Sequence, residues 1–491
     1  MGSHLEKAYD ELLYNNKEQD ELKKDLRELE LDEFYAEEKF GPITWDERLA
    51  FWLRRNLIIP IKHKIKNSSI FQDDYKNGRT KVRLCGLKFS YINPKLVIRP
   101  DYTPVISKIQ NKYKNKEKIR VGFLVNENCK WNAEYLYNLL EENEHFEPII
   151  LITLYDTRHQ KKDMTKSSIE DNYNFFASTG KRVEKVYDEE NEKYLAIKDF
   201  DIDILFYQQP WGLDDSQSIE ETANDSLCCY FAYGISAVEC PADVRPFHEK
   251  LFAYFIPNEE TKTFLESIKI NNLDNLNIVG YPKLDIYNNL SKTRQIRKTI
   301  IYAPHHSYKR GLKLGTFNKT GMQILEFAKQ HKEYNWVFKP HPDLKEVLYK
   351  DKKYRKEFTE NYYKQWAEIG KVYDKGNYFE QFMQTDILIT DCDSFLLEYM
   401  PTLNPIIRLE RKDSVKLSKL GQEIVKGIYC ASNFDECVNI LKKLDKPNQD
   451  ELKVKRKEIT DSILRKTTNA SANIVAELEK LFTSYGVVNE K

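Results

Sequence analysis

The stretch Ile119-Arg-Val-Gly-Phe-Leu-Val125 is a short, almost wholly apolar run, and a stretch with helical character, Trp131 to Glu142, follows it. The run Pro148-Ile-Ile-Leu-Ile-Thr-Leu154 then repeats the pattern. Three more runs of this kind lie at residues 202–207, 227–231 and 251–256. Apolar strands that alternate with helices are typical of a doubly wound parallel sheet, buried on both faces.

A second set of strands and helices begins after the segment 276–285. We predict strands at residues 299–303, 336–339, 386–390 and 405–409, and helices at 322–331, at 378–383 and from 395. Residues 450–482 form a long charged helical region, long enough to cross back to the first half. The predicted fold class is therefore α/β of the GT-B type: two facing Rossmann-like domains with a cleft between them, plus an N-terminal helical extension.

Composition limits the class of protein. The chain has 491 residues, with 77 Lys and Arg against 77 Asp and Glu. A nucleic-acid binder would carry a basic surplus, so we expect no nucleic-acid partner. The longest early apolar run, 57–61, is far shorter than the roughly 20 residues of a membrane-spanning helix. The 8 Cys form no CxxC pair and no zinc-binding spacing, which favours free cytosolic thiols.

The N-terminal region, residues 1–116, contains separate acidic and basic stretches, although the net charge of the whole chain is zero. Residues 5–39 are mainly acidic and predict a helix, either a solvated one or one that pairs with a partner or a second copy. Thr44-Trp-Asp-Glu47 is a capping box that begins a second helix. Residues 48–66 interleave basic and aromatic side chains, which suits either an anionic membrane surface or packing against the next domain. Residues 81–91 predict a small hairpin.

Four motifs follow one another in the second half of the chain. They are Gly280-x-Pro282-Lys-x-Asp285, Tyr302-Ala-Pro304, Lys339-Pro-His-Pro342 and Thr385-Asp-Ile-Leu-Ile-Thr-Asp-Cys-Asp-Ser394. In this order they resemble the CDP-glycerol:glycerophosphotransferase family, which includes teichoic-acid polymerases and related capsule enzymes. The resemblance covers residues 279–409 well and the sheet from residue 119 loosely, and it leaves out the first 115 residues or so.

The resemblance implies an enzyme that transfers a polyol phosphate, most simply glycerol phosphate, from a CDP-linked donor to a hydroxyl of a polysaccharide or lipid-linked acceptor, with release of CMP. It implies an acceptor domain at 117–290, a donor domain with the crossing helix at 291–491, no metal and no cofactor. The expected location is the cytoplasm, at the inner face of the membrane. Two alternatives remain open: a GT-B glycosyltransferase that uses a nucleotide sugar, and a non-catalytic polysaccharide-assembly factor.

The loop 391–394 lies between a predicted strand and a predicted helix. Amides at a helix N-terminus, with the Ser394 hydroxyl, can hold a phosphate, and we place Asp391 in the same donor-binding loop. Family members often have Asp-Tyr-Ser-Ser here, so Asp393 is a departure that either faces the phosphate or caps the helix. Glu398 matches a family carboxylate that accepts ribose hydroxyls; the alternative is a surface glutamate.

Two further loops follow predicted strands and carry histidine. Two prolines preorganise His341, which is predicted to donate to phosphate or to stabilise charge during transfer, while Lys339 binds phosphate or pairs with a carboxylate. His305, His306 and Arg310 predict an electropositive donor pocket, with a solvated basic turn as the alternative. No third metal ligand stands at a useful spacing from this pair, so zinc is not expected.

The acceptor side is less well specified. The family's first-half histidine, proposed as the base, has no match, and Tyr233 takes its position. Tyrosine is a poor base at neutral pH, so His306 is a second candidate. The remaining alternatives for the base are His248, Glu127 and Glu239. For acceptor binding we predict Glu127 and Asn128, which follow the first strand, and Trp211, which either stacks on a sugar or packs between helices.

Overall fold

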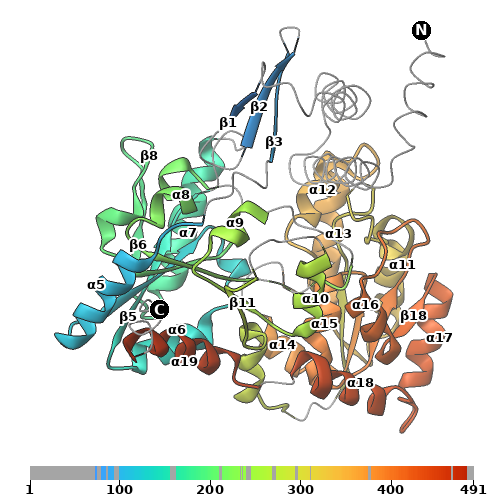
Figure 1. Ribbon diagram of the computed structural model, residues 1–491. Coiled ribbons are helices and arrows are strands. Elements are labelled where there is room, and N and C mark those ends of the chain that lie inside the picture. Colours follow the sequence, from blue (N-terminus) through green and yellow to red (C-terminus); the bar gives the residue numbers. More distant parts are fainter. Residues whose placement is uncertain are drawn as a thin grey trace, which may run out of the picture. The chain divides into compact units, whose positions relative to one another are not determined.

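The computed structural model of the 491-residue chain falls into two units (Figure 1). The smaller unit consists of Met1–Ile98, Pro241–Pro246 and Lys309–Leu312, and the larger unit of the rest. The structure describes residues 72–74, 79–84, 87–92, 99–154, 162–209, 213–232, 234, 236–238, 245–267, 273–293, 297–309, 311–373, 378–465 and 468–483. The predictions for residues 5–66 lie outside these ranges.

The smaller unit contains an antiparallel sheet with the order β1-β2-β3. Its strands are β1 (Gln72–Asp74), β2 (Arg79–Leu84) and β3 (Leu87–Ile92). The pairing of β2 with β3 confirms the predicted hairpin. Within the described residues, no helix is both long enough and apolar enough to span a membrane.

The first large sheet has seven parallel strands in the order β12-β11-β10-β9-β4-β5-β6. From its first strand outward this is the Rossmann order, in which the chain first moves to one side of β4 and then returns to the other. The strands are β4 (Ile119–Val125), β5 (Phe146–Ile152), β6 (Val183–Lys185), β9 (Ile204–Tyr207), β10 (Leu227–Phe231), β11 (Ala253–Ile256) and β12 (Leu276–Ile278). The connecting helices include α6 (Glu134–Glu142), α7 (Lys162–Ala177), α9 (Arg245–Lys250) and α10 (Glu259–Ser267).

The second large sheet has six parallel strands in the order β15-β14-β13-β16-β17-β18, which is again the Rossmann order. The strands are β13 (Thr299–Ala303), β14 (Asn335–Phe338), β15 (Gly370–Val372), β16 (Ile387–Thr390), β17 (Ile406–Leu409) and β18 (Tyr429–Ala431). The helices include α11 (Phe317–Gln330), α12 (Leu344–Lys350), α13 (Arg355–Ile369), α14 (Phe379–Met383), α15 (Asp393–Tyr399), α16 (Lys419–Ile424) and α17 (Phe434–Leu444). Two Rossmann-type halves confirm the predicted α/β, GT-B-like fold class.

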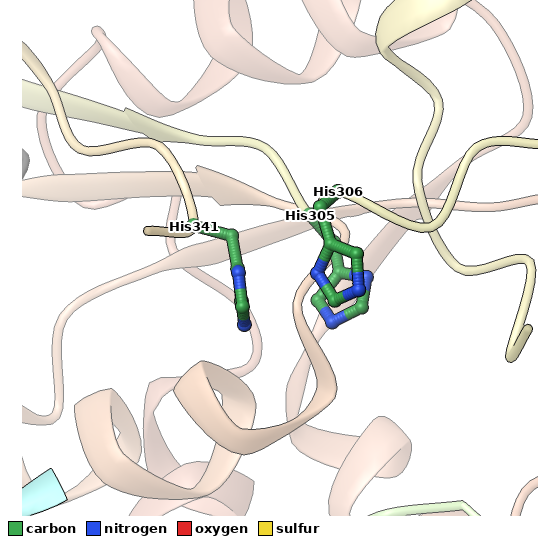
Figure 2. A group of neighbouring side chains, drawn as sticks. All are labelled: His305, His306 and His341. Carbon is green, nitrogen blue, oxygen red and sulfur yellow. The ribbon is translucent and has the colours of Figure 1, made fainter. Parts of the chain in front are cut away.

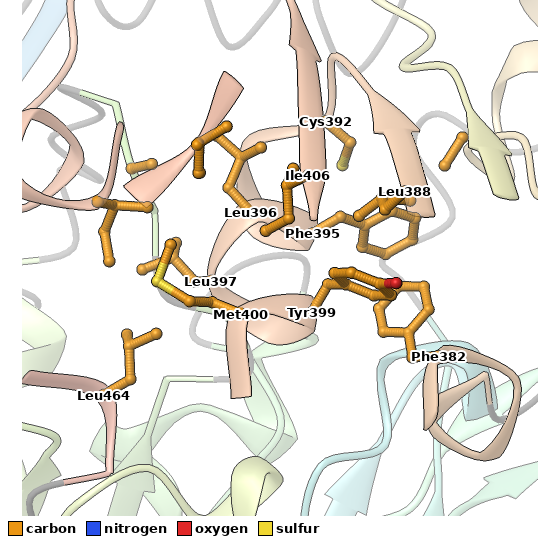
Figure 3. Packing of buried hydrophobic residues seen from close by; sticks show 14 of the residues in the cluster. Phe382, Leu388, Cys392, Phe395, Leu396, Leu397, Tyr399, Met400, Ile406 and Leu464 are labelled. Atoms are coloured by element: carbon orange, nitrogen blue, oxygen red, sulfur yellow. The ribbon is translucent and has the colours of Figure 1, made fainter. Parts of the chain in front are cut away.

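The helix α15, which follows β16, is anchored in one of the hydrophobic cores of the second half (Figure 3). The ring of Phe382 lies 5.2 Å from the rings of both Phe395 and Tyr399, edge-on in each case. Leu396 and Met400 are buried in the same cluster. Because interiors are close-packed, this anchoring gives the loop before α15 a fixed position.

The C-terminal region is not the single long helix that the sequence predicted. It consists of α18 (Lys453–Ile459), a π-helical turn at Thr460–Leu464 and a separate helix, α19 (Ala470–Thr483). The two carboxylate oxygens of Asp285 accept hydrogen bonds from the main-chain N–H groups of Ala470 and Ser471, so a carboxylate caps the new helix.

The helix α19 returns to the first half of the chain, where it packs beside α6 and α5 (Thr103–Lys114) (Figure 1). Gln110 of α5 donates to the carbonyl of Leu481 at 3.1 Å, and Asn143 donates to the carboxylate of Glu479 at 2.9 Å. The C-terminal segment therefore connects the second sheet to the helices of the first.

Candidate functional site

The Rossmann order of the second sheet places its topological switch point between β13 and β16. Ligands of such sheets bind outside the carboxyl ends of the strands at this point. The loop that follows β13 carries His305 and His306, and the loop that follows β16 carries Asp391. His341 follows the adjacent strand β14. The strand order therefore brings three of the four sequence motifs to one edge of the sheet.

Main-chain hydrogen bonds tie the loop after β14 to the loop after β13. The N–H of Lys339 donates to the carbonyl of Tyr302 at 2.9 Å, and the N–H of His341 donates to the carbonyl of Pro304 at 3.0 Å. These bonds continue the pairing of the two strands beyond their ends. They place the residue after Pro304, His305, directly beside His341.

The three histidines form one cluster (Figure 2). Their ring centroids are 4.3 Å apart for His305 and His306, 4.8 Å for His305 and His341, and 4.2 Å for His306 and His341. One nitrogen from each ring lies within 4.8 Å of the other two, so the group has the residue types and spacing of a metal site. The sequence-based statement that the pair has no third ligand was therefore wrong, because His341 is distant in sequence and adjacent in space.

Burial governs the protonation of the cluster. Desolvation lowers the pKa of His305, of His306 and of His341, because a low-dielectric environment disfavours the charged imidazolium. The other rings of the cluster, Lys339 and Lys130 lower the pKa of His341 further, whereas the carboxylate of Asp343 opposes the shift at His306. The cluster therefore consists of neutral imidazoles near neutral pH.

Asp391 engages the protein's own backbone. One carboxylate oxygen accepts the main-chain N–H of His305 at 2.5 Å, and the other accepts the N–H and the hydroxyl of Thr316 at 2.5 and 2.8 Å. Burial raises the pKa of Asp391 to about 6, against the opposing effect of these hydrogen bonds. Asp391 therefore fixes the loop that carries the histidines, a role that the sequence did not reveal because two of its three partners are main-chain N–H groups.

Glu398 is 2 % exposed and has two partners of its own. One carboxylate oxygen accepts from Lys283 at 2.8 Å, and the other accepts a short hydrogen bond from the hydroxyl of Tyr378. The hydroxyl of Tyr287 donates to the main-chain carbonyl of Glu398 at 2.6 Å. The surface-glutamate alternative was wrong, and the lysine of the first motif forms the ion pair with this residue.

Lys339 is 3 % exposed and lies over aromatic rings. Its ammonium group is 4.8 Å from the ring centroid of Tyr378 and 5.6 Å from that of Phe395. Cation–π attraction of this kind holds a lysine in place without neutralising its charge. Lys339 therefore adds a positive charge next to the neutral histidine cluster.

The N-terminal end of α15 contacts the first half of the chain. Asp393 accepts a hydrogen bond from the hydroxyl of Ser236 at 2.8 Å, and burial raises the pKa of this carboxyl group. The hydroxyl of Ser394 lies 3.4 Å from the buried thiol of Cys392. Val238, two residues after Ser236, forms an isolated antiparallel bridge with Leu417. Segments of the two halves therefore pair directly.

The loops that end β4 and β9 in the first sheet are also joined. The side-chain carbonyl of Gln208 accepts the main-chain N–H groups of Asn126 and Glu127 at 3.0 and 3.1 Å. Asn128 is held through its main-chain N–H, which donates to Asn172 at 2.8 Å. This turn presents polar side chains at the carboxyl end of the sheet.

Lys130, in the 3₁₀ turn Asn128–Lys130, is a site residue that the sequence did not single out. Its ammonium group donates to Glu127 at 3.0 Å and to Gln209 at 3.4 Å. It is also close enough to His341 to lower the pKa of that residue. A lysine of the first sheet therefore contributes charge to a cluster of the second.

Four of the candidate residues lie outside the part of the chain that the structure describes, and a fifth, His248, is enclosed within the first half. Tyr233, Trp211 and Arg310, as well as the alternative base Glu239, lie outside the described residues. His248 is buried, with its ring stacked at 4.6 Å on that of Tyr254, and burial lowers its pKa to about 3. A base that is so hard to protonate and so enclosed is a poor candidate for proton transfer.

The fold and the positions of the motifs define a class: a GT-B-like protein built from two Rossmann-type halves, with three of its four sequence motifs at the switch point of the second sheet. Residues 251–478 match the family described as CDP-Glycerol:Poly(glycerophosphate) glycerophosphotransferase. The matched region contains all four motifs, which confirms that this part of the chain is similar to enzymes of the CDP-glycerol glycerophosphotransferase family.

Solved structures show distant likeness. A putative UDP-N-acetylglucosamine 2-epimerase from Listeria monocytogenes is 13 % identical, covers 74 % of this chain and 97 % of its own, and has a TM-score of 0.47. The wall teichoic acid polymerase TagF, in a variant soaked with CDPG for 15 minutes, is 15 % identical, covers 78 % and 93 %, and has a TM-score of 0.47. No curated protein matches the chain.

Proposed function

We propose that this enzyme transfers a polyol phosphate, most simply glycerol phosphate, from a CDP-linked donor to a hydroxyl of a surface polysaccharide or teichoic-acid-like polymer. The observation that carries the proposal is the convergence of His305, His306 and His341 at the switch point of a domain that matches the glycerophosphotransferase family. Phosphoryl transfer depends chiefly on positioning and charge stabilisation, which such a cluster can supply.

In the proposed reaction, an acceptor hydroxyl oxygen attacks the β-phosphorus of the donor. A new phosphorus–oxygen bond forms, the bond between the β-phosphorus and the bridging oxygen breaks, and CMP leaves with that oxygen. The hydroxyl proton passes to a base. We assign this role to His306, a neutral ring whose pKa the neighbouring carboxylate of Asp343 helps to sustain. Tyr233 remains a second candidate.

The donor diphosphate is proposed to bind His305, His341 and the hydroxyl of Ser394, with Lys339 supplying charge. Arg310 extends this set. We propose that Asp391 and Glu398 position the site rather than bind donor, since their oxygens already accept hydrogen bonds from the protein. A carboxylate turned toward a diphosphate would in addition repel it.

The acceptor is proposed to approach from the first sheet. Glu127 and Asn128 lie on the loop that carries Lys130, and the effect of Lys130 on His341 relates this loop to the donor site. Trp211 is proposed to stack on the acceptor. We place the reaction in the cytoplasm at the inner face of the membrane, where a lipid-linked acceptor would be found.

The test is a release assay on the full chain with a panel of donors. CDP-glycerol, CDP-ribitol, a UDP-sugar and a CMP-sugar are each incubated with a teichoic-acid-type acceptor, and the free nucleotide is measured. CMP released from a CDP-polyol, with the polyol phosphate recovered in the polymer, supports the proposal. UDP from the UDP-sugar, or CMP from the CMP-sugar alone, would identify a glycosyltransferase. Absence of donor binding in a thermal-shift assay would favour an assembly factor.

A further inference from the structure

Two histidines of the cluster receive a main-chain hydrogen bond from the residue two positions later. The N–H of Ser307 donates to Nδ1 of His305 at 3.1 Å, and the hydroxyl of Ser307 lies 2.8 Å from the same nitrogen. The N–H of Asp343 donates to Nδ1 of His341, also at 3.1 Å. The same local turn thus occurs in both loops.

These bonds determine which nitrogen carries the proton. A main-chain N–H can only donate, so Nδ1 must offer its lone pair, and a neutral imidazole then carries its hydrogen on Nε2. The carboxylate oxygen of Asp343 lies 3.8 Å from Nδ1 of His341, too far to accept a hydrogen bond from it. At His305, the hydroxyl of Ser307 accepts from the N–H of Leu314 at 3.2 Å, which leaves the hydroxyl hydrogen to point at Nδ1.

This arrangement is the reverse of that in a histidine metal site. A metal-bound histidine usually donates its second N–H to a carboxylate or carbonyl group, which leaves the other nitrogen to bind the metal. Here the protein donates to Nδ1, so the Nε2 atoms are themselves donors. These Nε2–H groups can donate hydrogen bonds to an oxyanion, but they cannot bind a metal ion. The positive charge of Lys339 next to them also favours an anionic ligand.

We propose that His305 and His341 form a pair of neutral Nε2–H donors that binds a phosphate oxyanion of the donor, and that the cluster is an anion site rather than a metal site. The nature of the ligand rests on the function proposed above. The assignment of the tautomers depends only on the hydrogen bonds within the two loops. The tautomers and the proposed function can therefore be disproved independently.

The first test is the tautomeric state. Long-range ¹H–¹⁵N correlation spectra of the full chain, labelled with ¹⁵N at histidine, distinguish Nε2–H from Nδ1–H, and single His→Asn variants assign the two rings among the 9 histidines. We expect Nε2–H for His305 and His341 without ligand. A proton on Nδ1 of either ring would overturn the proposal.

The second test uses two substitutions that separate the turn from the donor. In His341→Asn the side-chain oxygen can still accept the N–H of Asp343, but no donor reaches the position of Nε2. His341→Gln places an amide N–H near that position. Calorimetric titration with CDP-glycerol should give affinity about 10- to 150-fold weaker for the Asn variant and partial rescue by Gln, because one hydrogen bond to a charged group is lost. Equal affinity of wild type and the Asn variant would contradict the proposal.

The control is His331→Asn. His331 lies at the C-terminal end of α11, next to Glu333 and outside the cluster, so donor affinity should not change. Inorganic pyrophosphate serves as a second probe. If CDP-glycerol does not bind but pyrophosphate binds the wild type and not His341→Asn, the anion site stands and the proposed function fails.

The third measurement is metal content. We expect the purified full chain to carry no stoichiometric zinc, and added Zn²⁺ to leave the Nδ1 signals of both rings unchanged. Zinc bound at one ion per chain, lost in His305→Asn and His341→Asn, would show that the cluster is a metal site and would overturn the proposal.

Discussion

The carboxylate of Asp391 accepts the main-chain N–H of His305 at 2.5 Å. Through this bond the loop after β16 fixes the loop after β13 across the switch point of the second sheet. The second carboxylate oxygen holds Thr316, where α11 begins. A buried carboxylate thus determines where the loop that carries His305 lies.

Asp391→Ala should impair both stability and transfer. Three hydrogen bonds to a buried carboxylate are lost and the His305 loop is released, so we expect unfolding to become easier by about 3 kcal/mol and CMP release to slow by about 100-fold. Denaturant unfolding and the release assay measure the two effects. Asp386→Asn is the matched control: its carboxylate accepts the N–H of Thr299 at the opposite end of β13, so stability should fall while the Michaelis constant for donor stays the same.

Glu398→Gln tests whether the glutamate is a partner of Lys283 or a ligand of ribose. The substitution leaves the lysine buried without its counter-charge, which typically costs about 3 to 5 kcal/mol of unfolding free energy. The double variant Lys283→Met with Glu398→Gln should recover part of this loss in a thermodynamic cycle. A Glu398→Gln protein as stable as wild type, with weakened donor binding only, would instead favour the ribose role.

Donor affinity should not depend on the charge of the histidine cluster. The pKa of His305 and that of His341 both lie well below the ordinary value of about 6.5, so both rings stay neutral above that pH. Lys339, Lys130 and the carboxylates of Asp343 and Asp391 are the other charges that act on the cluster. CDP-glycerol keeps a constant charge near neutrality, so its dissociation constant should be flat between about pH 7 and 8.5. If imidazolium were the ligand, affinity would fall by about tenfold per pH unit.

His248 predicts a pH dependence of stability. Burial holds the pKa of His248 at about 3 in the folded chain, below its ordinary value, so the unfolded state takes up the proton first. The stabilisation is fully present above about pH 6.5 and is lost as the pH falls toward 3. Relative to His248→Phe, the wild type should lose about 2 kcal/mol between about pH 6.5 and 5. Denaturant titrations of both proteins at several pH values measure the difference, and parallel curves would contradict it.

Asp285→Ala should loosen the C-terminal helix. Removing the carboxylate that caps the N-terminus of α19 typically costs about 1 to 2 kcal/mol, and the buried main-chain N–H groups of Ala470 and Ser471 would lose their partner. We expect faster proteolysis between α18 and α19 than in wild type. Glu479→Ala, which removes only the contact of α19 with Asn143, is the milder control.

Much of the fold could be predicted from the sequence because the central strands are apolar on both faces. Six of them are found at or within one residue of their predicted bounds: β4, β10, β13, β14, β16 and β17. The edge strands β6, β15 and β18 were missed, since each has only three residues, too few to give a periodic signal. The interruption between α18 and α19 was also missed, because a charged helical pattern continues through it.

The sequence by itself determined the class of this enzyme: two sets of buried strands, and four short motifs placed after strands in the order of the glycerophosphotransferase family. Only the tertiary structure decided how the motif residues act. It places the ring of His341 beside that of His305 and pairs Glu398 with Lys283. It also directs one carboxylate oxygen of Asp391 to the main-chain N–H of His305. The physical reason is that local patterns encode burial and strand ends, whereas hydrogen bonds between loops arise only when the strand order of the sheet brings distant residues together.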